Sequence, residues 1–157
     1  MAKGKLKLTR WQIFLILYSC VMLWLLFGRS VRKIDGLSYD QQLLHNTNFD
    51  PFHTIGNYIS VLTEPKKKHL LTESIVNLGG NIFLFIPAGW LFPKVWPFLR
   101  KFFVFLAFCA GVILLVEIIQ LITLLGCFDV DDLILNLFGM CLGFALFKTM
   151  AHRGILP

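Results

Sequence analysis

Charged residues are scarce in this chain of 157 amino acids. Only 15% are Asp, Glu, Lys or Arg, whereas 57% are apolar, and the mean hydropathy is +0.72. Soluble domains are typically about a quarter charged and about half apolar. The shortage of charge excludes an ordinary soluble domain, because so much apolar surface has to be covered by lipid. The sequence predicts an all-α, polytopic membrane protein that forms one domain over residues 1–157.

Sequence features of several other protein classes are also missing. Three of the four cysteines fall in apolar runs and Cys127 stands alone, so no disulfide framework is indicated. Neither His-x-x-Glu-His nor Gly-x-Ser-x-Gly occurs, and no internal repeat of the transporter kind is evident. The net charge of +6 comes from basic residues that flank apolar runs, so we expect no nucleic-acid partner. Catalytic residues and cofactors therefore stay unknown, and no metal site is predicted.

Four apolar runs predict four transmembrane helices, at about residues 10–28, 76–92, 102–125 and 133–150. The first run also resembles the core of a signal peptide, but no small-x-small cleavage site follows it, so we expect a retained span.

Residues 29–75 form a long polar segment between the first two runs. After Asp50-Pro51, this segment predicts a short helix to about Leu62, which is stopped by Pro65 and is either interfacial or re-entrant.

Small residues and proline within the runs predict how the helices pack. Pro87 predicts a kink in the second span, because its ring removes a backbone hydrogen bond. Gly139 and Gly143 are four residues apart, which favours close approach of another helix, and Gly89 is expected to act similarly.

Basic residues are unevenly divided among the short connections. The N-terminal tail carries four Lys or Arg and the 93–101 loop carries three, whereas the 126–132 turn carries none and has three acids. The positive-inside rule then predicts that both termini are cytoplasmic and that residues 29–75 and 126–132 face outward.

Polar side chains gather near the outer ends of three predicted spans. Two asparagines are four residues apart in the second span, a Glu and a Gln are three apart in the third, and an Asp and an Asn are four apart in the fourth. Each pair shares one helix face. We expect one ligand-binding pocket in the outer half of the bilayer, formed by Asn77, Asn81, Glu117, Gln120, Asp129, Asp132 and Asn136.

Each of these residues also has a purely structural interpretation. Asn and Gln often join transmembrane helices by hydrogen bonds worth about 0.6–2 kcal/mol. Asp132 is the best candidate to cap the fourth span as well as a site residue. Glu117 is hardest to explain structurally, because a carboxyl at that depth has to be protonated or to meet a cation.

Several segments together resemble the VanZ-like family, in the right order and over about residues 46–147. They are residues 48–55, residues 77–89, Glu117-Ile118-Ile119-Gln120, and the run 128–136 followed by the two spaced glycines. The resemblance implies a small protein of the bacterial cytoplasmic membrane with about four or five spans. The family's namesake lowers sensitivity to the glycopeptide teicoplanin. Many members carry an arginine just before the aspartate turn, where this sequence has Leu124-Leu125.

Two main functions remain open at this point. The first is a non-enzymatic envelope protein that binds a membrane lipid, a lipid-linked molecule or a lipidated one such as a lipoglycopeptide. The second is a membrane enzyme acting on a lipid-linked envelope precursor, with Glu117 as acid or base and the Asp129–Asp132 turn as metal ligands. A transporter or accessory subunit, in the form of a homo-oligomer, is a third.

Overall fold

The computed structural model describes residues 8–28, 34–63 and 70–154. Its elements follow in the order α1 (Arg10–Phe27), α2 (Tyr39–His45), β1 (Thr47–Asn48), α3 (His53–Thr63), α4 (Leu71–Phe83), α5 (Ile86–Val95), the 3-10 helix η2 (Pro97–Arg100), α6 (Phe102–Thr123), β2 (Phe128–Asp129) and α7 (Val130–His152). Within the described residues, four helical stretches are long and apolar enough to cross a membrane: α1, Ser74–Val95, α6 and α7. The predicted all-α polytopic fold is confirmed.

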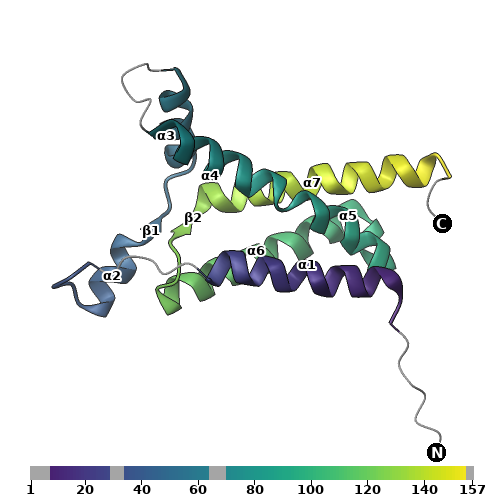
Figure 1. The fold of residues 1–157 in the computed structure, drawn as a ribbon, viewed down its shortest axis with the longest axis horizontal. Coiled ribbons are helices and arrows are strands. Elements are labelled where there is room, and N and C mark those ends of the chain that lie inside the picture. The colour runs from purple at the N-terminus through teal and green to yellow at the C-terminus, as the bar shows by residue number, and fades with distance from the viewer. Residues whose placement is uncertain (1–7, 29–33, 64–69, 155–157) are drawn as a thin grey trace, which may run out of the picture.

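Figure 1 shows α1, α4, α6 and α7 running roughly alongside one another, with α2 and α3 at one end. The strands β1 and β2 form a two-residue parallel pair at that same end, in which Thr47 pairs with Phe128 and Asn48 with Asp129. The predicted short helix after Asp50 is present as α3, which packs against α4. Neither α2 nor the strand pair was expected from the sequence.

Helix ends differ from the predicted spans where capping or proline decides them. The fourth span begins at Val130 rather than 133, because the Asp129 side chain accepts a hydrogen bond from the Asp131 N–H and caps the helix. The expectation that Asp132 is the cap is therefore wrong. The helix before the basic loop continues through Pro93 to Val95, so that loop is shorter than expected.

The second span is broken in two at its proline. Helix α4 ends at Phe83 and α5 begins at Ile86, with Pro87 in the first turn of α5. A proline is tolerated there because the first helical N–H groups have no intrahelical acceptor to lose. Both halves contact α7 along the face that carries Gly139 and Gly143.

Glycines allow α4 and α5 to lie directly on α7. A Cβ atom at Gly143 would overlap the carbonyl oxygen of Ile86, and one at Gly139 would overlap that of Ile82. On the facing helix, a Cβ at Gly89 would overlap the carbonyl oxygen of Met140. These neighbours are backbone atoms that cannot rotate away, so the helix separation depends on the missing side chains.

We predict that Gly143→Ala destabilises the protein by about 1–3 kcal/mol, because the added methyl forces the packed helices apart. Gly111→Ala in α6 is the matched control, since a Cβ there meets nothing within 4 Å. The control is expected to be neutral or stabilising, because alanine favours helix more than glycine does. Unfolding in mixed detergent micelles measures both, and equal stability of the two variants would contradict the packing account.

Candidate functional site

A cavity of about 430 Å³ lies where α6 ends and α7 begins. Its walls come from the last turn of α1, from α4, from α6, from residues 125–127 and from the start of α7. Six of the seven expected site residues line it: Asn77, Asn81, Glu117, Gln120, Asp132 and Asn136. The helix periodicity thus pointed to side chains that the fold brings to one place, and a ligand-binding role for them stays a prediction.

Three amide side chains in this cavity tie helices together. The Asn81 amide donates to the Asp132 carboxylate, which joins α4 to α7. The Asn77 amide donates to the Tyr58 hydroxyl of α3 at 3.0 Å, and the Gln120 amide donates to the Leu26 carbonyl of α1 at 2.8 Å. These amides have the helix-joining contacts that their structural interpretation required.

Two other residues of the cavity lining carry buried oxygens without a hydrogen-bond partner. Glu117 and Asn136 are each 4% exposed, and within the described part of the chain Glu117 Oε2 and Asn136 Oδ1 have no hydrogen-bond partner. A buried polar atom without a partner costs about 1–3 kcal/mol. Native proteins rarely keep such atoms without a reason, and both belong to residues that line the cavity.

Asp129 does not line the cavity, contrary to the expectation. Its carboxylate accepts hydrogen bonds from the Thr54 hydroxyl at 2.6 Å and from the Asn48 amide at 3.2 Å, besides capping α7. The cause is the β1–β2 pairing, which sets Asn48 beside Asp129 and turns the carboxylate toward the start of α3.

Asp131 was missed as a structural residue, although it is completely buried. Its two oxygens accept from the backbone N–H of Phe52 at 2.6 Å and of Ile55 at 3.0 Å. Phe52 has a left-handed backbone with φ of +66°, which this carboxylate helps to hold. Helix periodicity does not predict this contact between distant segments. The one signal in the sequence was that residues 48–55 and 128–136 both belong to the segments that resemble the VanZ-like family.

The three aspartates of the turn therefore point to different partners. Two bind residues 48–55, from the end of β1 to the first turn of α3, and Asp132 lines the cavity with Glu117. Within residues 8–28, 34–63 and 70–154, no three His, Cys, Asp or Glu side chains are grouped so that they could hold a metal ion.

The cavity wall is acidic. Two carboxyls line it, and its lining contains no Lys, Arg or His. Cys127 lies in the wall, outside the membrane-spanning helices, and partial burial raises the pKa of its thiol. The carboxyls of Asp129, Asp132 and Glu117 raise that pKa further, because they oppose formation of a thiolate.

Comparison with known proteins agrees with this architecture. The VanZ/LLP1 family model matches residues 14–151. The chain belongs to the VanZ/LLP1 family. It is 31% identical to Protein VanZ of Enterococcus faecium over 137 aligned residues. The alignment covers 85% of this chain and 70% of the relative. No solved structure matches it. With its four candidate spans, it is a multi-pass membrane protein of the VanZ type and belongs to the cell envelope.

In this VanZ-family protein, two leucines lie at the end of α6 beside the cavity. They occupy the position where the resemblance implies an arginine. Leu124 ends α6 in a left-handed conformation with φ of +53° and is buried, and Leu125 lines the cavity. The carboxyls of this VanZ-family cavity thus face a leucine wall.

We predict that Asp131→Asn destabilises the protein by about 1.5–3 kcal/mol, the usual worth of hydrogen bonds to a charged group. The amide keeps one acceptor oxygen but sets its own N–H groups against a backbone N–H. Asp50→Asn is the control, because Asp50 is an exposed aspartate in the connection that Asp131 holds. Unfolding measurements on both variants in one detergent test the difference, and a loss no larger than that of the control would refute the anchoring role.

Proposed function

We propose that this protein binds a lipid-linked or lipidated molecule in the cavity and thereby lowers the sensitivity of the cell envelope to teicoplanin. The observation that carries the proposal is the pair of buried, unpaired oxygens on Glu117 and Asn136 in one cavity wall. Polar groups at such depth in a membrane are rare and are usually functional.

The chemistry of the wall supports one class of polar head. Carboxyl oxygens accept hydrogen bonds and repel anions, and no basic side chain of the lining offsets them. A head that donates N–H or O–H groups therefore suits the cavity better than a phosphate does. An amine, an amide or a sugar hydroxyl of an envelope glycopeptide or precursor has this property.

An apolar tail has a surface on which to lie. Val76 and Leu84 line the cavity and are also 53% and 39% exposed, so the polar interior continues into a surface made of apolar side chains. A lipidated ligand can keep its chain in the membrane while its head occupies the cavity, which lowers the cost of burying the head alone.

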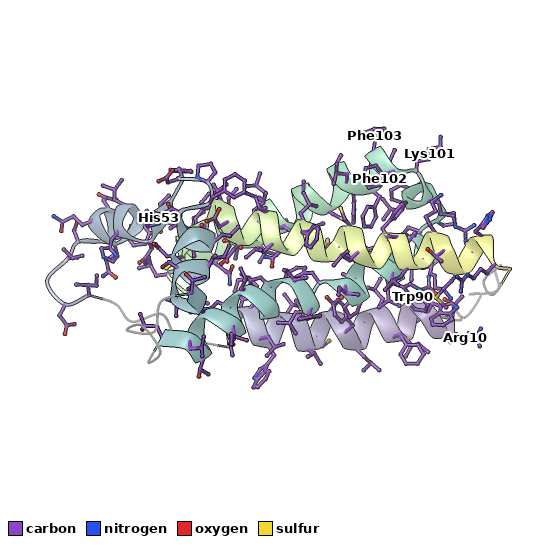
Figure 2. All side chains as sticks on the ribbon, turned by 90° about the horizontal axis from the view of Figure 1, so that it is seen from above. Arg10, His53, Trp90, Lys101, Phe102 and Phe103 are labelled. Carbon is purple, nitrogen blue, oxygen red and sulfur yellow. The ribbon has the colours of Figure 1, made fainter. Side chains whose placement is uncertain are left out.

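The direction of the cavity also supports action at the outer face. In Figure 2, Lys101 and Arg10 are labelled at the end of the bundle opposite His53 of α3. The cavity lies toward the end that carries α3, since its lining includes the last turn of α1 and the first turns of α7. The positive-inside rule predicts that the end with Arg10 and Lys101 is cytoplasmic, so the end with α3 and the cavity is expected to face outward.

We predict that the wild-type chain raises the teicoplanin concentration needed to inhibit a susceptible bacterium and that Glu117→Gln removes most of this effect. The substitution replaces the carboxyl of a cavity-lining residue by an amide, and the loss of one hydrogen bond to the ligand head weakens binding by about tenfold. Growth inhibition at matched membrane levels is the measurement.

Asp40→Asn is the matched control, since Asp40 is an exposed carboxylate on α2 and does not line the cavity. It is expected to protect like the wild type. Equal protection by Glu117→Gln would make that carboxyl incidental, and absence of protection by the wild type would reject the link to teicoplanin.

A further inference from the structure

A second hollow lies between α1 and α5, distinct from the polar cavity. It is an apolar groove of about 310 Å³ lined by Trp11, Phe14, Tyr18, Pro87, Trp90 and Leu91. The Tyr18 hydroxyl donates to the Leu84 carbonyl at 2.7 Å, and the Trp90 indole N–H donates to the Met150 sulfur at 3.3 Å, so both of these polar groups are satisfied by the protein itself. A groove with this lining suits a hydrocarbon chain.

Two positive charges meet at one end of this groove. The Lys94 ammonium lies 3.5 Å from the centre of the Trp11 ring and 4.4 Å from that of Trp90. The Arg10 guanidinium lies 4.8 Å from the centre of the same Trp11 ring. Cation–π attraction holds each group against an indole, but two like charges on one ring repel each other.

Within the described residues, neither Arg10 nor Lys94 forms an ion pair with an acidic side chain. All nine Asp and Glu residues lie between Asp35 and Asp132 in the sequence. Figure 2 labels Arg10 and Trp90 at the same end of the bundle as Lys101. An anion between the two cations would remove the repulsion.

The contact of α1 with the rest of the bundle is sparse. Only Leu15 and Met22 are buried among its 18 residues, and its main contact is with α5, across the groove. A molecule that fills the groove would therefore add apolar contact where the protein itself supplies little.

We propose that this groove binds one anionic phospholipid, with its phosphate between Arg10 and Lys94 and one acyl chain along Trp11, Phe14 and Trp90. Basic pockets between transmembrane helices on the cytoplasmic side bind anionic head groups in this manner. The site is independent of the polar cavity, so it stands or falls apart from the proposed function.

Tryptophan quenching by brominated lipids tests the proposal. Trp24→Phe and Trp96→Phe in the full-length protein leave Trp11 and Trp90 as reporters, both in the groove. The protein is placed in phosphatidylcholine bilayers that contain either phosphatidylglycerol or phosphatidylcholine brominated on an acyl chain. We expect brominated phosphatidylglycerol to quench the tryptophan fluorescence at a clearly lower mole fraction than brominated phosphatidylcholine does. Removal of each cation is expected to reduce this preference about fivefold.

Matched charge variants separate a site from general attraction. Arg10→Gln with Lys94→Gln should abolish the preference, whereas Lys101→Gln with Lys148→Gln removes the same charge and should retain it. If the double variant does not fold, Lys94→Gln alone tests the same site, and it should lose part of the preference. Equal quenching by both lipids in the parent, or the same loss in both double variants, would overturn the proposal.

Discussion

The backbone contact of α4 and α5 with α7 is the interaction on which the rest of the structure depends. Gly139 and Gly143 let carbonyl groups of the broken second span lie against α7, and Gly89 returns the contact from α5. In a membrane, packing of this kind replaces the hydrophobic effect as the force between helices. The same contact brings Asn81 of α4 to Asp132 of α7, so the cavity wall follows from the glycines.

The polar side chains at this end of the bundle divide into two groups with different physical roles. Asp129 and Asp131 have their oxygens occupied by residues 48–55, from the end of β1 to the first turn of α3, and they anchor these residues to the start of α7. Glu117 and Asn136 keep oxygens without a partner in the described structure, at a cost to stability that a ligand would remove. The polar groups at this end of the bundle therefore include both structural anchors and candidate binding groups.

The sequence predicts the four spans and six residues of the cavity wall because both depend on local patterns, namely apolar length and the helix repeat. It fails where contacts join distant segments. The β1–β2 pair links residues 81 apart at each rung, and with it come the true partners of Asp129 and Asp131. Neither α2 nor the partners of Asp131 could be inferred, since no periodicity records which loop will reach a helix start. For the same reason, the sequence predicts Asp132 rather than Asp129 as the cap of α7, because pairing with β1 positions the chain before this helix.

Protection of Cys127 by ligand tests the central claim most directly, because this thiol lines the cavity and is reachable from solvent. The measurement is the rate of thiol alkylation in purified protein in which Cys20, Cys109 and Cys141 are replaced by alanine, with and without teicoplanin. If the cavity binds the polar head of the drug, teicoplanin should slow the alkylation of Cys127. In the Glu117→Gln variant, teicoplanin should slow it little. An alkylation rate unchanged by teicoplanin, in a protein that still protects cells, would contradict binding in this cavity.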